Sequence, residues 1–193
     1  MATYLLTWNP ARWQWTDLQE CINNIERKGY HLDSWGSGVT KKVQPGDRVF
    51  LIKLGEEPRG IMASGWAISG VYIGKHWDKA IQAKGKKALY IDVRFDTILD
   101  PDKAVFPRAR LDDGIYGKMH WDSRASGITI PDDVAARLEI EWAQLLNQPV
   151  PLDEGILAEE ADTITTFKEG ATKQVTVNVY ERSVEARTAC IKH

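Results

Sequence analysis

Apolar residues recur at strand spacing over most of the first 100 positions of the chain. Within residues 88–95 every second side chain is apolar, as expected of a strand with one buried face. A nearly continuous apolar run at 48–54 follows a turn-forming stretch at 44–47 and indicates another strand. These patterns predict at least five strands, at residues 4–8, 30–35, 48–54, 60–73 and 88–95.

Two further segments have the 3.6-residue periodicity of amphipathic helices. Thr16 or Asp17 can cap the first, which ends near Lys28 and Gly29. The second is predicted at 131–146, where a proline and two aspartates suit a helix N-terminus and Trp142 lies on the apolar face. Strands combined with flanking helices predict a mixed fold of the α/β (α+β) class.

Acidic residues divide the chain into parts. Residues 151–170 contain six acids and one lysine, a local net charge of −5, whereas the whole chain carries −2. The other 173 residues therefore carry +3 and are mildly basic. We expect a domain at 1–147, an acidic linker at 148–170 and the beginning of another domain at 171–193.

The chain shows no sign of export or of a membrane span. No window approaches eighteen uncharged apolar residues, and the first residues contain no basic leader followed by an apolar stretch. The two cysteines, Cys21 and Cys190, lie far apart in sequence, which favours reduced thiols over a disulfide framework. We therefore expect a cytoplasmic, bacterial-type protein with no membrane partner.

Eight tryptophans are many for 193 residues. Helical spacing places Trp142 in a core, and for any other single tryptophan packing is the simpler role. Taken together, indole rings at strand ends and beside small or polar residues are what a base-stacking pocket requires, since each stack contributes roughly 1–3 kcal/mol. The candidate rings are Trp8, Trp35, Trp66, Trp77 and Trp121.

Among the sequences around the candidate tryptophans, the stretch at 34–38, Ser-Trp-Gly-Ser-Gly, is the most informative. Its glycines allow close backbone approach, its hydroxyls donate or accept hydrogen bonds, and Trp35 offers a flat apolar wall. A tight turn with an incidental tryptophan is the alternative. We name Trp35, Gly36 and Ser37 as candidates for binding a base, with Asn9 as a reader of its polar edge.

Catalytic motifs are weak. The four histidines show no pairing at metal-ligand spacing, and no serine or cysteine lies in a known nucleophile motif. Adjacent aspartates at 112–113 and 132–133 are more typical of turns and helix starts. We therefore predict no catalytic residue, no metal site and no cofactor for this chain.

Four motifs, in their order along the chain, resemble the EVE branch of the PUA-like fold, a relative of YTH domains. They lie at 4–10 (Tyr-Leu-Leu-Thr-Trp-Asn-Pro), 34–36, 45–51 and 60–66, and the resemblance covers about residues 3–146. It implies a small, strongly bent β-barrel flanked by helices, with a modified base held in an aromatic pocket. Trp35 corresponds to one wall of that pocket, Trp77 is the candidate for the second wall, and Trp8, Trp66 and Trp121 are weaker candidates.

The tail resembles the lead-in to a His-Asn-His (HNH) nuclease domain, through the sequences at 167–170, 175–178 and 180–187. Such domains continue into a CxxC zinc site and a metal-binding histidine motif, and neither is present. The resemblance implies a modification-dependent, type IV-like restriction endonuclease as the parent. Divalent metal and structural zinc are expected only in the missing nuclease domain, so this chain should bind DNA without cutting it.

The expected partner is double-stranded DNA with a modified cytosine, of the 5-methylcytosine or 5-hydroxymethylcytosine type, flipped into the pocket. Basic residues between 41 and 59 fit a solvated face as well as a nucleic-acid surface, and four of them are candidate phosphate contacts: Lys41, Lys42, Arg48 and Arg59. A reader of modified RNA remains an alternative, as does a small-molecule or protein interaction domain. A homodimer is compatible with either.

Overall fold

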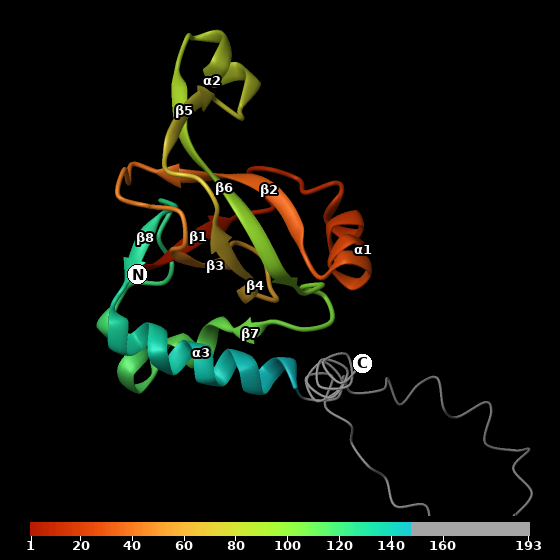
Figure 1. Ribbon diagram of the computed structural model, residues 1–193, viewed down its shortest axis with the longest axis vertical. Coiled ribbons are helices and arrows are strands. Elements are labelled where there is room, and N and C mark those ends of the chain that lie inside the picture. Colours follow the sequence, from red (N-terminus) through yellow and green to blue (C-terminus); the bar gives the residue numbers. More distant parts are fainter. Residues whose placement is uncertain (148–193) are drawn as a thin grey trace, which may run out of the picture. The chain divides into compact units, whose positions relative to one another are not determined.

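The computed structural model describes residues 1–147, where eight strands form one mixed sheet flanked by helices (Figure 1). The hydrogen-bonded order is β2-β6-β4-β3-β1-β8, with β5 paired to β6 and β7 paired to β4. β1 and β3 run parallel, and the other pairs are antiparallel. The strands are β1 (Thr3–Trp8), β2 (His31–Gly38), β3 (Arg48–Lys53), β4 (Gly60–Ala67), β5 (Tyr72–Lys75), β6 (Lys87–Ile98), β7 (Phe106–Pro107) and β8 (Ile128–Ile130).

The two predicted helices are confirmed as α1 (Leu18–Lys28) and α3 (Asp132–Leu146). Asp17 occupies the N-cap position of α1, although its side chain makes no capping hydrogen bond. Gly29 ends this helix at a φ of 77°, a left-handed conformation that glycine adopts without a Cβ penalty. Four of the five predicted strands are present with boundaries shifted by at most three residues, and the one predicted at 60–73 is two strands, β4 and β5.

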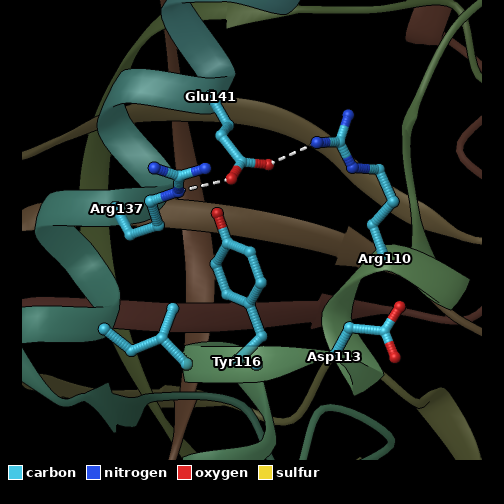
Figure 2. A pocket seen from close by; sticks show the side chains of 7 residues that line it. Arg110, Asp113, Tyr116, Arg137 and Glu141 are labelled. Atoms are coloured by element: carbon cyan, nitrogen blue, oxygen red, sulfur yellow. Dashed lines mark hydrogen bonds and ion pairs between the residues drawn. The ribbon is translucent and has the colours of Figure 1, made fainter.

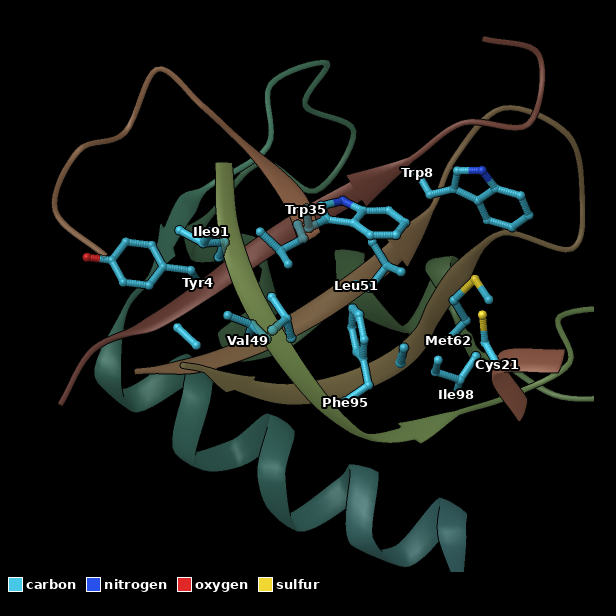
Figure 3. Close-up of a cluster of buried hydrophobic side chains, with 14 of the residues drawn as sticks. Tyr4, Trp8, Cys21, Trp35, Val49, Leu51, Met62, Ile91, Phe95 and Ile98 are labelled. Carbon is cyan, nitrogen blue, oxygen red and sulfur yellow. The ribbon is translucent and has the colours of Figure 1, made fainter. Parts of the chain in front are cut away.

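The strand β3 is buried on both faces, which explains why its sequence does not alternate. Val49 and Leu51 point into one hydrophobic cluster, and Phe50 and Ile52 point into another. We call the first the inner core; Figure 3 shows its side chains within the curled sheet, and residues of α1 pack against it. The second, the outer core, lies between the sheet and α3 and includes Trp142 in its predicted core role.

The expected closed barrel is not formed. The two ends of the sheet, β2 and β8, are not paired with each other. The sheet nevertheless curls until they nearly meet, since a Cβ on Gly38 of β2 would lie 2.3 Å from the backbone oxygen of Ser126, just before β8. The α+β class is therefore confirmed, with an open, curled sheet in place of a barrel.

The sequence patterns left several short elements undetected. They are α2 (Lys79–Ala83), the 3-10 helices η1 (Arg108–Asp112) and η2 (Gly114–Lys118), and the strands β7 and β8. Each is five residues long or shorter, too short to establish a periodic pattern. The predicted linker at 148–170 and nuclease fragment at 171–193 lie outside the described residues. In the part of the chain that the structure does describe, no helix is long and apolar enough to cross a membrane.

Candidate functional site

The structure brings only two of the five candidate tryptophans together. Trp8 at the end of β1 and Trp35 on β2 both belong to the inner core. Trp66 lies on β4 beneath the guanidinium of Arg48, 4.8 Å from its ring centroid. Trp77 follows β5 and is half exposed. Trp121 is buried in the outer core, so it cannot share a pocket with Trp35, and that expectation is corrected.

Two further tryptophans complete a group of four. Trp13 and Trp15 come from the loop at 9–17, which joins β1 to α1, and fold back onto Trp8 and Trp35. We call these four residues the tryptophan cluster. The Trp15 and Trp35 ring centroids are 5.0 Å apart, Trp13 and Trp35 are 5.6 Å apart at 77°, and Trp13 stacks on Trp15 at 5.8 Å. One end of the inner core is therefore lined by mutually contacting indoles.

Exposure distinguishes the members of the tryptophan cluster. Trp8, Trp15 and Trp35 are 7%, 7% and 6% exposed, whereas Trp13 is 39% exposed. A purely structural cluster has no need of an indole at the surface, because burying the whole ring is more stabilising. Trp13 therefore forms an accessible edge of an otherwise buried aromatic group.

Backbone contacts hold the loop at 9–17 against the sheet. The carbonyl oxygen of Asn9 accepts hydrogen bonds from the amides of Arg12 and Trp13, at 2.9 and 3.2 Å. The indole nitrogen of Trp8 donates to the carbonyl of Trp13 at 3.0 Å. On the opposite side, the indole nitrogen of Trp35 donates to the carbonyl of Thr7 at 3.3 Å. The rings are thus oriented by hydrogen bonds as well as by packing.

The predicted polar readers have different environments. The side-chain oxygen of Asn9 accepts a hydrogen bond from the amide of Ala11 at 3.0 Å, which leaves its NH2 group as an available donor, and this side chain lies against Gly55. Ser37 is fully buried, and its hydroxyl donates to the carbonyl of Thr40 at 3.2 Å. Gly36 is partly exposed beside a β-bulge, and a Cβ there would meet nothing within 4 Å. Asn9 and Gly36 therefore remain accessible, while the Ser37 hydroxyl is already used.

The inner core also shields a thiol beside the tryptophan cluster. Cys21 on α1 is 1% exposed. Burial, with a contribution from the negative charge of Asp17, raises the pKa of this thiol to about 11. The thiol therefore stays protonated at neutral pH and acts as a small apolar residue rather than a nucleophile.

Of the four predicted phosphate contacts, Arg48 is corrected by its burial and pairing, whereas Arg59 is paired but half-exposed and stays a prediction. Arg48 is 6% exposed and donates to Asp96 at 2.6 Å and to Glu139 at 2.7 Å. Arg59 pairs with Glu57 at 2.6 Å. The acids that pair with Arg48 are distant in sequence, so its local pattern does not reveal them, whereas Glu57 lies two residues before Arg59. Lys41 and Lys42 are exposed in the loop that follows β2, as a phosphate contact requires.

A second concave region lies between η2 and α3 (Figure 2). Glu141 on α3 is 6% exposed and accepts hydrogen bonds from Arg110 at 2.8 Å and Arg137 at 2.5 Å. The Tyr116 hydroxyl points towards this group and is buried without a hydrogen-bond partner. Burial, aided by the charge of Glu141, raises the pKa of Tyr116 to about 12. With Asp113 at its rim, this cleft of about 530 Å³ has two cations facing two acids and no excess charge.

Within residues 1–147, no group of three or more histidines, cysteines, aspartates and glutamates is placed to hold a metal ion. The chemistry available at the tryptophan cluster is instead that of stacking surfaces with one nearby amide donor. Such a site is suited to a flat, uncharged ring carrying hydrogen-bonding groups on its edge.

No protein-family model and no curated protein matches the chain. Its fold is similar to those of several solved structures, including the following three. A hypothetical protein from Leishmania major has a TM-score of 0.50 and 14% identity, over 75% of this chain and 96% of that one. A protein from Pseudomonas syringae has a TM-score of 0.51 and 16% identity, over 72% and 99%. One from Pseudomonas putida has 0.50 and 13%, over 72% and 98%. At these identities the likeness shows a shared fold alone.

Proposed function

We propose that residues 1–147 form a reader of modified DNA, in which a cytosine modified at its 5-position leaves the duplex and stacks within the tryptophan cluster. The observation that carries this proposal is the exposed ring of Trp13, which lies at the edge of three buried indoles. The proposal keeps the EVE-type, PUA-like resemblance as its framework, with an open sheet in place of the barrel. The parent protein would be an HNH restriction endonuclease directed by this domain.

The base would enter between Trp13 and Trp35. Their ring centroids are 5.6 Å apart, edge to face, whereas a ring held between two walls needs roughly 7–8 Å between them. The loop at 9–17 must therefore open by about 2 Å, and the Trp13 ring must turn from 77° to lie parallel to that of Trp35. Trp13 then covers the second face of the base, the role that the sequence had left to Trp77. Extrusion costs a few kcal/mol, and two stacks of roughly 1–3 kcal/mol each offset that cost.

The edge of the base would be read by groups beside the cluster. The NH2 group of Asn9 is a donor for the carbonyl oxygen of cytosine, and the backbone near Gly36 is open to close approach. The hydroxyl of Ser37 is bonded to Thr40, so Ser37 contributes through its position in β2 and not through its side chain.

The test of this function is a set of affinities measured for the full chain. Matched duplexes of one sequence would carry cytosine, 5-methylcytosine, 5-hydroxymethylcytosine or its glucosylated form at a single position. We expect tighter binding to at least one modified duplex than to the unmodified one. Equal affinities for all four would refute the proposal. Tighter binding to single-stranded RNA of matched modification would instead favour the RNA-reading alternative.

Replacing Lys41 and Lys42 together by glutamine should weaken binding to modified and unmodified duplexes alike. Both side chains are exposed, and phosphate contacts contribute affinity without sequence information. Two lost contacts should reduce the slope of log affinity against log salt concentration by about 2. A salt titration with both duplexes measures this. Normal affinity for both would move the contact surface away from this loop.

In this proposal the domain binds and does not cut. Cleavage by an HNH nuclease requires a positioned metal ion and a histidine that activates water, functions that we assign to a separate nuclease domain. Purified chain incubated with modified plasmid and magnesium or manganese should leave the DNA intact while a gel shift shows a complex. Cleavage that disappears with a point mutation inside residues 1–147 would contradict this assignment.

A further inference from the structure

A hairpin that projects from the sheet concentrates positive charge. We call residues 72–87 the arm; it comprises β5, α2 and the turn into β6, and Figure 1 shows it extending beyond the rest of the domain. The arm contains five lysines and one aspartate, a net charge of +4 with His76 neutral. The remainder of residues 1–147 contains fifteen basic and eighteen acidic residues, a net charge of −3. The positive charge of the domain is therefore localised in the arm.

The lysines of the arm are available to a partner. All five are exposed, and none takes part in the ion pairs found within residues 1–147. Three arginines behave differently, because Arg48, Arg59 and Arg108 are each paired with acids. The arm lysines are Lys75, Lys79, Lys84, Lys86 and Lys87.

Large apolar side chains are exposed among these lysines. Ile73, Trp77 and Tyr72 are 67%, 50% and 39% exposed, and neither β5 nor α2 contains a buried residue. Trp77 stacks on His76 at 5.4 Å and 30°, which leaves part of the indole facing solvent. These side chains add little to the core of the domain, so a folding role does not account for them.

Contacts within the arm give it a defined shape. The Tyr90 hydroxyl of β6 donates to the carbonyl of Lys75 at 2.7 Å. Gly74 makes room for that ring, since a Cβ there would lie 2.8 Å from Tyr90. Asp78 caps α2 by accepting the amide of Ala80 at 2.8 Å. A partner therefore meets a preformed ribbon, and little additional ordering is needed on binding.

We propose that the arm enters the major groove of duplex DNA. A groove about 12 Å wide admits a two-stranded β-ribbon, and Lys75 and Lys87 lie opposite each other across this ribbon, one cation on each strand. They and the lysines of α2 and its turn contact the phosphates, while Trp77 lies against the groove wall. The choice of DNA as partner rests on the proposed function, whereas the residues of the arm are separate from the tryptophan cluster.

An anionic membrane is the other polyanion that lysines and a tryptophan can bind. An interfacial segment separates its apolar face from its charged face. In the arm, Ile73 and Lys75 are two residues apart on one strand, so they lie on the same face of the ribbon. This mixed face favours a groove lined by phosphates and bases over a lipid surface.

The experiment compares two triple variants of the full chain that change charge equally. The arm variant is Lys79→Gln, Lys84→Gln and Lys86→Gln, which spares the paired lysines of the ribbon. The control variant replaces three lysines elsewhere: Lys28→Gln, Lys103→Gln and Lys118→Gln. Affinity for unmodified duplex is measured across salt concentrations. We expect the arm variant to bind about tenfold more weakly or worse, with a salt slope reduced by 2 to 3 (~0.9 per lost contact), and the control to resemble the wild type.

Thermal unfolding should be unchanged in the arm variant, because none of its three side chains is buried. A second variant, Trp77→Ala, should bind duplex several-fold more weakly with the lysines intact. The proposal is overturned if the arm variant binds duplex as the control does, or if it loses binding only to phosphatidylserine vesicles. If wild-type protein does not distinguish modified from unmodified duplex yet depends on the arm for both, the reader proposal fails and the groove contact stands.

Discussion

Trp13→Ala is expected to remove the preference for modified duplex while leaving the domain folded. In the proposed complex this ring covers one face of the base, and losing one stack of roughly 1–3 kcal/mol corresponds to a 5- to 150-fold weaker interaction with the modified base. Its 39% exposure and its place on a loop limit the loss of stability, which we expect to be about 1–2 kcal/mol. Affinities for modified and unmodified duplexes, with urea unfolding, measure both quantities.

Two comparisons make this result specific. Trp13→Phe keeps an aromatic wall and should retain most of the preference. Trp35→Ala removes a ring that is 6% exposed and packed against Phe95. It should therefore lower the free energy of unfolding by about 3–5 kcal/mol, and it should also weaken binding to modified duplex. A Trp13→Ala protein that still prefers modified duplex would show that the base does not contact this ring.

Arg48→Leu is expected to destabilise the domain by about 3 kcal/mol without a direct effect on DNA contacts. Arg48 joins three parts of the fold, since it begins β3 and pairs with Asp96 of β6 and Glu139 of α3. Removing one member of a largely buried ion pair leaves the carboxylates uncompensated, which costs about 3–5 kcal/mol when the pair is fully buried. We place the effect at the lower end because Asp96 and Glu139 are 30% and 41% exposed.

Thermal and urea unfolding measure this change, and a melting temperature lowered by roughly 6–12 °C is expected for a domain of this size. Arg124→Leu is the matched control, because Arg124 is exposed and makes no ion pair within the described residues. An Arg48→Leu protein of normal stability with a reduced salt slope for DNA would instead restore Arg48 as a phosphate contact.

The longer elements could be predicted because burial imposes a period on the sequence. Residues 88–95 alternate since β6 has one face in the inner core, and α3 places Trp142 in the outer core as its spacing indicates. The stretch at 34–38 was less clear, because a bulge between Gly36 and Gly38 continues β2 through what resembles a turn. Whether the sheet closes into a barrel depends on how strongly it curls, and no local sequence pattern predicts that curvature.

The candidate site could be predicted only in part, for reasons that concern long-range contacts. Trp8 and Trp35 belong to one cluster, in which each ring contacts Trp15. Trp13 and Trp15 were missed although a signal existed, since two tryptophans spaced by one residue in a polar loop are unusual in a chain segment with no strand pattern. Arg48 was misjudged because its acidic partners, Asp96 and Glu139, are brought to it only by the fold.

Extrusion of the modified cytosine is tested most directly by the fluorescence of a 2-aminopurine placed beside a single 5-methylcytosine. If the domain prefers another modification, that modified cytosine replaces 5-methylcytosine in the duplex. The emission of 2-aminopurine rises when its neighbour leaves the stack, so it reports extrusion itself. We predict a rise on binding of the wild-type chain, a smaller rise with the unmodified duplex, and little rise with Trp13→Ala. A clear preference for the modified duplex with unchanged emission would contradict the account, because the modification would then be read within the groove.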